Sequence, residues 1–179
     1  FLPGVGAFGD AMACIRERGL ETVIRKVCES GVPFLGICLG LQILFEESEE
    51  SPGVTGLSIL PGKVVRFPAE CPDVFRRKNG FPGAHLKVPE IGWNALSYPD
   101  PSVSERGRLF DGVPEGSYVY YVHSYYLQAA DASMVKARSD YGVSFDASVE
   151  KGNIFACQFH PEKSEKVGMR ILKNFLEVR

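Results

Sequence analysis

The chain has 179 residues, of which 45% are hydrophobic and 23% charged, and its formal net charge is −2. This length and apolar content suffice for a single α/β domain, and the balanced charge argues against nucleic acid or an anionic membrane as a partner. Five cysteines without a C-x-x-C pair argue against a disulfide framework and a metal site, so we expect a cytoplasmic protein in a reducing compartment.

The first stretch of the chain, LPGVGAFG at 2–9, has the glycine spacing of a dinucleotide-binding loop. In that kind of loop an acidic residue closes the following strand and holds the ribose hydroxyl. The following apolar run, 32–37, is predicted as a strand, and it leads into Cys38 instead of a carboxylate. A thiol at the tip of a parallel strand indicates a nucleophile, so the opening loop needs a different role.

Hydrophobic periodicity predicts helices before and after this strand. The first is expected to begin with Asp10 as its N-cap, to be interrupted at Gly19 and to stop at Gly31. A second helix follows Cys38 directly and is expected to fray into the acidic run at 46–50, which we interpret as a solvated helix end instead of a binding tail. Later strands are predicted at 63–67, 86–88, 118–123, 134–137 and 153–160, and a final amphipathic helix is predicted to begin near Ser164.

Strands that alternate with helices predict the α/β class, with an open, mostly parallel sheet that carries helices on both faces. The chain starts on Phe1, and 1–3 are typical of the end of a strand whose beginning is absent. We therefore expect one N-terminally truncated domain that spans 1–179.

The stretch Gly36-Ile37-Cys38-Leu39-Gly40 has the G-x-nucleophile-x-G form of an elbow, in which a sharp turn lifts the side chain out of the sheet. Side chains two positions before and after the nucleophile would clash in such a turn. A helix N-terminus and a nearby imidazole lower a thiol pKa, so we expect Cys38 to be partly thiolate at neutral pH. The alternative is an inert thiol in the core.

A general base for this thiol has to come from the three histidines of the chain, which are His85, His123 and His160. His85 lies in a Pro/Gly-rich segment and is expected at the surface. His160 ends an apolar strand at the carboxyl edge, where open α/β sheets place their active sites. Glu162 follows after Pro161 and can orient the imidazole, so the sequence predicts a Cys-His-Glu triad.

These residues resemble the class I glutamine amidotransferases, with GICLGLQ at 36–42 as the nucleophile motif and HPE at 160–162 as its partner. Within that family, the resemblance is to the glutaminase subunits of imidazole glycerol phosphate synthases, and it is carried by the stretches 2–9, 92–94, 123–126 and 161–164. Members begin with a further strand, helix and strand, which implies a flavodoxin-like, type-1 glutamine amidotransferase domain with that segment missing. Glu90 stands where a histidine is expected in this family.

The resemblance implies a reaction that needs no cofactor. The thiolate of Cys38 would attack the carboxamide of glutamine, and His160, oriented by Glu162, would give a proton to the departing ammonia. Hydrolysis of the thioester would then release glutamate.

The resemblance also assigns roles around the triad. The backbone N–H groups of Gly4, Val5 and Leu39 would form an oxyanion hole, and Gln42, Ser124 and Tyr125 would hold the substrate glutamine. Trp93 and Lys163 would contact a cyclase subunit with a (β/α)8 barrel in a heterodimer. Ammonia passed to that subunit would form imidazole glycerol phosphate and AICAR in histidine biosynthesis.

Three other functions fit parts of the sequence. Another class I amidotransferase shares the triad, although Lys163 after HPE and the GWN stretch favour the histidine pathway. A cysteine hydrolase or peptidase of similar fold would differ in its activity towards glutamine. A catalytically silent subunit that only binds a partner would leave Cys38 unreactive towards a glutamine-mimicking alkylator.

Overall fold

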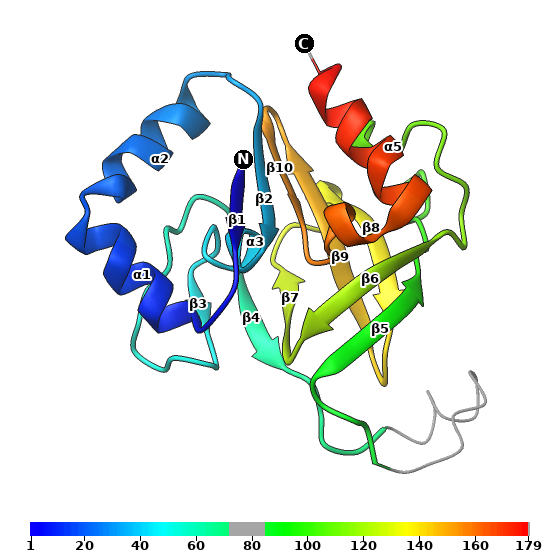
Figure 1. Ribbon diagram of the computed structural model, residues 1–179, viewed down its shortest axis with the longest axis horizontal. Coiled ribbons are helices and arrows are strands. Elements are labelled where there is room, and N and C mark those ends of the chain that lie inside the picture. Colours follow the sequence, from blue (N-terminus) through cyan, green and yellow to red (C-terminus); the bar gives the residue numbers. More distant parts are fainter. Residues whose placement is uncertain (72–84, 179) are drawn as a thin grey trace.

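The computed structural model describes residues 1–71 and 85–178, which form one main sheet with helices on both sides (Figure 1). The strand order in this sheet is β1-β2-β10-β9-β7-β4-β3, and β8 pairs with β9. Its strands are β1 (Leu2–Gly4), β2 (Phe34–Cys38), β3 (Glu47–Ser48), β4 (Gly62–Arg66), β7 (Tyr125–Ala129), β8 (Val135–Asp140), β9 (Ser144–Lys151) and β10 (Ile154–Cys157). A second sheet pairs β5 (Glu90–Ala95) with β6 (Tyr118–His123).

The predicted α/β class with helices on both faces is confirmed. On one side lie α1 (Phe8–Glu17) and α2 (Leu20–Glu29), and on the other lies α5 (Glu165–Leu176). Each side has its own buried apolar cluster, one built around α1, α2 and the segment after β2, the other around β6, β9 and α5. The remaining helical segments are α3 (Leu39–Gln42), η1 (Arg108–Phe110), η2 (Ala132–Met134) and η3 (Pro161–Lys163).

The main sheet is mixed, which corrects the expectation of a mostly parallel one. Its parallel part is β1, β2 and β10, together with the pair β3 and β4. β9 runs antiparallel to β7, β8 and β10, and β4 runs antiparallel to β7. Only Gly152 and Asn153 separate β9 from β10, and so short a connection can join only antiparallel neighbours.

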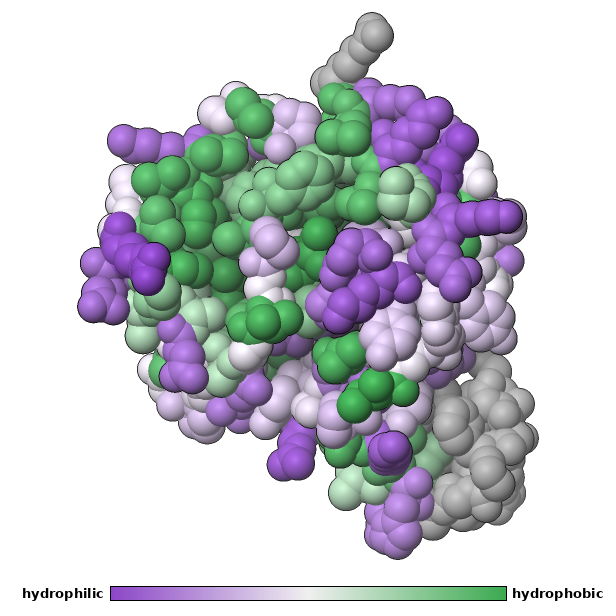
Figure 2. Space-filling view, viewed as in Figure 1, coloured by the Kyte–Doolittle hydropathy of each residue, from purple (hydrophilic) through white to green (hydrophobic). Residues whose placement is uncertain are grey.

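The outermost strand of the described sheet, β1, lies beside an apolar surface. Figure 2 shows apolar side chains gathered on this face between α2 and α5, and Phe1, Val23 and Val32 are among the exposed large apolar residues. The ring of Phe1 packs edge-on against Phe175 of α5, with ring centroids 5.0 Å apart. β1 thus pairs with β2 on one edge, and the residue before it, Phe1, packs against α5.

The helix predictions are confirmed in position and corrected in detail. Ala7, not Asp10, is the N-cap of α1, so Asp10 lies in the first turn, where its charge favours the helix dipole. The helix after Cys38 ends at Gln42, and the acidic run that follows is not a helix end.

The carboxylates of the acidic run 46–50 accept hydrogen bonds from the backbone of other elements. Glu46 accepts the N–H of Gly62 at 2.9 Å, and Glu49 accepts the N–H of Arg66 at 2.8 Å. Glu50 accepts the N–H of Phe8 at 2.7 Å, at the start of α1. The run therefore joins β4 and α1 to the segment between them.

The strand predictions near 63–67, 118–123, 134–137 and 153–160 are confirmed as β4, β6, β8 and β10. The strand expected at 86–88 is absent, and β5 begins two residues later. β7 and β9 were not predicted, since β7 follows β6 after Ser124 alone and the two read as one aromatic run. No helix in the described part of the chain is long and apolar enough to span a membrane.

Candidate active site

The predicted elbow is confirmed at Cys38, which joins β2 to α3 with φ 55° and ψ −109°. A side chain seldom adopts this strained conformation unless its surroundings enforce it. A Cβ atom on Gly36 would lie 2.6 Å from the carbonyl oxygen of Gly40, and one on Gly40 would lie 1.8 Å from that of Leu2. Both glycines are therefore required by the close approach of backbone, as the motif predicts.

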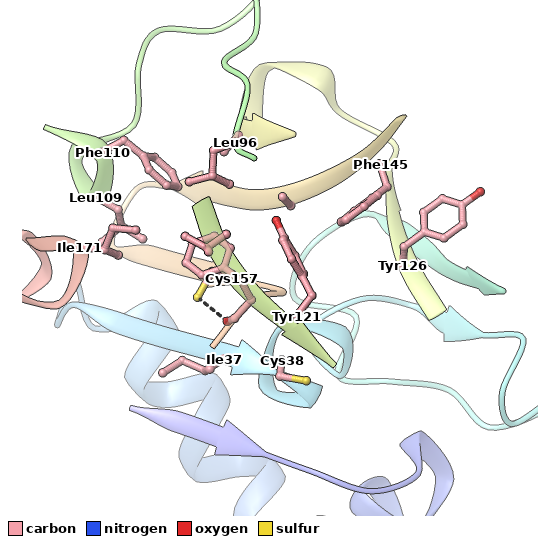
Figure 3. Packing of buried hydrophobic residues seen from close by; sticks show 14 of the residues in the cluster. Ile37, Cys38, Leu96, Leu109, Phe110, Tyr121, Tyr126, Phe145, Cys157 and Ile171 are labelled. Atoms are coloured by element: carbon pink, nitrogen blue, oxygen red, sulfur yellow. Dashed lines mark hydrogen bonds between the residues drawn. The ribbon is translucent and has the colours of Figure 1, made fainter. Parts of the chain in front are cut away.

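Most of the predicted site residues surround one cavity of about 320 Å³. Those that line it are Val5, Cys38, Leu39, Gln42, Ser124, Tyr125, His160 and Lys163. Gly4, Trp93 and Glu162 are not in the lining. Figure 3 shows Cys38 at the end of β2, at the margin of the apolar cluster that includes Ile37, Tyr121 and Cys157. The elbow thus brings the thiol from the core to the cavity.

His160 is buried, and both its backbone and its ring are held in place. Its Nδ1 lies 2.8 Å from Oε1 of Glu162, so the expected contact within HPE is present. Its backbone N–H donates to the carbonyl of Tyr120, and its carbonyl accepts the hydroxyl of Ser164. With Nδ1 engaged by the carboxylate, Nε2 is the ring nitrogen left to act as a base in the cavity.

Burial raises the pKa of the Cys38 thiol to about 11, which corrects the expectation of a partly ionised thiol at neutral pH. The backbone N–H of Leu39 and the amide of Gln158 favour the thiolate and lower this pKa, but desolvation outweighs them. The helix that begins at the elbow is only four residues long, so its dipole is small. A reaction at this thiol would therefore require a base to remove its proton.

The three residues expected to form the oxyanion hole converge on the elbow. In the parallel pairing of β1 with β2, Gly4 stands opposite Cys38. Val5 follows at the cavity and is exposed, while the backbone N–H of Leu39 points at the thiol. The positive φ in the opening loop is at Gly6, at 104°.

Gln158, which is fully buried beside the thiol, was not predicted as a site residue from the sequence. Its Nε2 lies 3.7 Å from Sγ of Cys38, and its Oε1 accepts a hydrogen bond from Gln42 at 3.1 Å. A polar residue inside the apolar strand that leads to HPE was the signal that could have identified it. Gln42 also donates to the carbonyl of Tyr125 at 3.2 Å.

Glu90 forms a buried pair with His123, which lies in the cavity wall, and sequence reasoning missed this pair as well. Nε2 of His123 lies 3.1 Å from Oε2 of Glu90, and its Nδ1 lies 2.8 Å from the carbonyl of Tyr125. The amide of Asn94 donates to the other carboxylate oxygen at 2.9 Å. The pair thus joins β5 and β6 to the residue that begins β7.

Replacing Glu90 by alanine is expected to lower the free energy of unfolding by about 3–5 kcal/mol, because the imidazole of His123 and the amide of Asn94 would lose their buried acceptor. Glu90→Gln keeps one acceptor oxygen and should cost less. Urea unfolding measures both changes, with the exposed Glu29→Ala as a control that should leave the midpoint in place. Equal stability of Glu90→Ala and Glu29→Ala would contradict the pair.

Trp93 stands on the outward face of the two-stranded sheet formed by β5 and β6. Its ring meets that of Tyr120 edge-on at 5.8 Å, and Ile91 stands opposite Val122 on the same face. Val122 and Lys163 also line the cavity, so this face borders the cavity. Among residues 1–71 and 85–178, no group of three or more His, Cys, Asp or Glu side chains is arranged to hold a metal ion.

Known proteins resemble this chain over nearly its whole length. The family described as "Glutamine amidotransferase class-I" matches residues 1–178. The imidazole glycerol phosphate synthase subunit HisH of Moorella thermoacetica is 48% identical over 177 residues, which are 99% of this chain and 75% of that protein. The same subunit of Syntrophotalea carbinolica is 50% identical over 174 residues, which are 97% of this chain and 78% of that protein.

Solved structures agree with the fold. A crystal structure of a glutamine amidotransferase has a TM-score of 0.64 at 23% identity, covering 98% of this chain and 75% of its own. A glutamine amidotransferase of Thermotoga maritima has a TM-score of 0.59 at 16% identity, covering 98% of this chain and 60% of its own. The chain spans about three quarters of the length of the two subunits named above. It belongs to the class I glutamine amidotransferases, in the family of the imidazole glycerol phosphate synthase subunit HisH.

Proposed function

We propose that this chain hydrolyses glutamine to glutamate and ammonia, with Cys38 as nucleophile, His160 as general base and acid, and Glu162 as the group that orients the imidazole. The observation that carries the proposal is the elbow thiol, which shares its cavity with a histidine whose Nδ1 is already engaged by a carboxylate. Family membership supports glutamine as the substrate.

The raised thiol pKa sets the order of events. Because Cys38 is protonated at neutral pH, Nε2 of His160 takes its proton as the sulfur attacks the carboxamide carbon. The resulting imidazolium, stabilised by Glu162, gives this proton to the amine nitrogen, and the C–N bond breaks to release ammonia. Water, deprotonated by His160, then attacks the thioester, and the proton returns to the sulfur as glutamate leaves.

The tetrahedral intermediate carries a negative oxygen, which needs donors that are in place beforehand. The proposed donors are the backbone N–H groups of Gly4, Val5 and Leu39, supported by their convergence on the elbow. Loss of one such donor typically costs about a hundredfold or more in rate. Gln42, Ser124 and Tyr125 are proposed to hold the substrate, since all three line the same cavity.

The outward face of the two-stranded sheet β5–β6 is the proposed docking site of the cyclase subunit. We expect that subunit to be a (β/α)8 barrel and the complex to be a cytoplasmic heterodimer. Ile91 and Trp93 are exposed apolar side chains there, and Lys163 lies at the cavity that this face borders. Apolar anchors beside a cation are typical of a specific subunit contact. Ammonia released at Cys38 would reach the cyclase across this border, to form imidazole glycerol phosphate and AICAR.

The test is a glutaminase assay of the purified chain, with and without the cyclase subunit and its ribonucleotide ligand. We expect slow hydrolysis alone and faster hydrolysis in the liganded complex, since a ligand can shift an equilibrium between two states only through differential binding. Equal rates would exclude coupling to this partner, and no hydrolysis under any condition would exclude the reaction.

Replacing Trp93 by alanine is expected to weaken binding to the cyclase subunit about 30-fold, because truncation of an aromatic anchor at an interface typically costs about 2 kcal/mol or more. Isothermal titration calorimetry measures the affinity. Met169→Ala removes an apolar side chain of α5 that is more exposed than Trp93 and should leave the affinity unchanged. An unaltered affinity of Trp93→Ala would show that the interface lies elsewhere than on the two-stranded sheet β5–β6.

A further inference from the structure

Gln158 makes contact at both ends of its side chain, and the reaction proposed above uses neither end. It follows β10 and is fully buried, and its backbone N–H donates to Ala147 of β9. The amide oxygen accepts from Nε2 of Gln42 at 3.1 Å, while the amide nitrogen lies 3.7 Å from Sγ of Cys38. Burying a polar amide away from water costs free energy, so buried amides normally have hydrogen-bond partners.

The contact with Gln42 decides which way the Gln42 amide faces. Nε2 of Gln42 has two hydrogens, and it donates to both Tyr125 and Gln158. Among the described residues, every fully buried side-chain polar atom has a hydrogen-bond partner. Oε1 of Gln42 has no such partner, so it is accessible, and it is accessible from the cavity that Gln42 lines. Gln42 therefore presents an acceptor to the substrate, which suits an ammonium or amide hydrogen.

The contact with Cys38 concerns the charge that develops on the sulfur. An N–H that faces sulfur gains strength when the thiol ionises, because hydrogen bonds to charged groups are roughly twice as strong as neutral ones. This amide therefore stabilises the thiolate more than the thiol.

We propose that Gln158 is a positioning residue for glutamine hydrolysis, which holds the Cys38 sulfur with one end and fixes the substrate-facing amide of Gln42 with the other. The proposal rests on the glutaminase function proposed above. It couples the nucleophile to the substrate site through one neutral side chain, so that both are set by the same buried group.

Neutral backbone groups also lie at the sulfur: the N–H of Leu39, and the carbonyl of Val122, to which the thiol donates at 4.0 Å. Charged and titratable side chains lie around them. Glu162 disfavours the thiolate and Lys163 favours it, both at longer range. The remaining titratable neighbours are His160, His123, Tyr125 and Glu50 in the cavity wall and Cys157 behind it. Because the amide does not titrate, its removal in Gln158→Met should slow alkylation by the same factor at every pH below the thiol pKa, without adding a new limb to the profile.

Two variants separate the two contacts. Gln158→Glu keeps an acceptor for Gln42 but places a carboxylate at the sulfur, and at the alkaline pH where the thiol ionises this carboxylate is ionised too. Gln158→Met removes both contacts at similar size. The rate of iodoacetamide alkylation of Cys38, followed by the mass of its peptide at several fixed pH values below the thiol pKa, reports the thiolate fraction, and KM and kcat for glutamine in the complex with the cyclase report the substrate site.

For Gln158→Glu we expect Cys38 alkylation at a fixed pH below the thiol pKa to slow about 10- to 100-fold and kcat to fall about 10- to 100-fold, with KM within about threefold of the wild type. For Gln158→Met we expect KM to rise about tenfold as well, because Gln42 loses its fixed orientation. Gln128→Glu is the matched control: the same substitution on the exposed side of β7 should change none of these values.

A side chain that only fills space would give folded variants with an unchanged alkylation rate and an unchanged ratio of KM to kcat, and that result would overturn the proposal. Circular dichroism reports folding, and the nearly isosteric Gln158→Glu keeps the test available if Gln158→Met fails to fold. An inactive wild type would overturn the glutaminase function alone, because the alkylation profiles are measured without turnover.

Discussion

Cys38→Ala is expected to reduce glutamine hydrolysis by about ten-thousand-fold or more, while the complex with the cyclase still makes product from added ammonium salt. Removal of a nucleophile leaves only the residual effect of the binding site, because no covalent intermediate can form. Synthesis from ammonium salt survives, since that chemistry belongs to the other subunit. Glutamate release and cyclase product are measured side by side at saturating glutamine or ammonium.

Cys157→Ala is the matched control for this experiment. Cys157 is another buried thiol close to the elbow, and its sulfur donates to the carbonyl of Phe159 in the core, away from the cavity lining. That variant should keep glutaminase activity, with at most a modest loss of stability from the smaller side chain. Glutamate release by Cys38→Ala at the wild-type rate would show that another group is the nucleophile.

The elbow and the HPE stretch could be predicted because most of the contacts that define each of them lie within a few residues of the chain. The carbonyl that crowds Gly36 belongs to Gly40 within the motif itself, so the sequence pattern carries this requirement, whereas the carbonyl that crowds Gly40 belongs to Leu2 of β1. Likewise, Pro161 is the one residue between His160 and Glu162, so the carboxylate of Glu162 lies within reach of the imidazole of His160.

The parts that could not be predicted depend on contacts between distant segments. β5 contains Gly92 and Asn94, which have weak strand propensity, and it is a strand because it pairs with β6. The contact of Gln158 with Cys38 spans 120 positions. The prediction of a lowered pKa for the Cys38 thiol was wrong for a related reason. The burial of the thiol depends on the whole fold, and its effect on the pKa outweighs that of the local donors.

Gly40→Ala is expected to lower the free energy of unfolding by about 3 kcal/mol or more and glutaminase activity by about a hundredfold or more. The added Cβ would lie 1.8 Å from the carbonyl oxygen of Leu2, so β1 has to move away from β2. In that pairing Gly4 stands opposite Cys38, and the displacement would carry the proposed oxyanion donors with it. A shift of about 1 Å in a site costs about this much rate. Urea unfolding and steady-state glutaminase assays of the complex measure the two effects.

Gly31→Ala separates this clash from the general cost of replacing a glycine. Gly31 has φ 81° and nothing within 4 Å of its added Cβ, so alanine there brings only backbone strain of about 1–2 kcal/mol. It lies after α2, far from the cavity lining, and should leave glutaminase activity unchanged. If Gly40→Ala lost no more stability than Gly31→Ala and kept its activity, the first strand would not be what holds the elbow and its donors together. A loss of activity in Gly40→Ala alone would place β1 within the catalytic apparatus, because its backbone both confines the nucleophile turn and leads into the proposed donors.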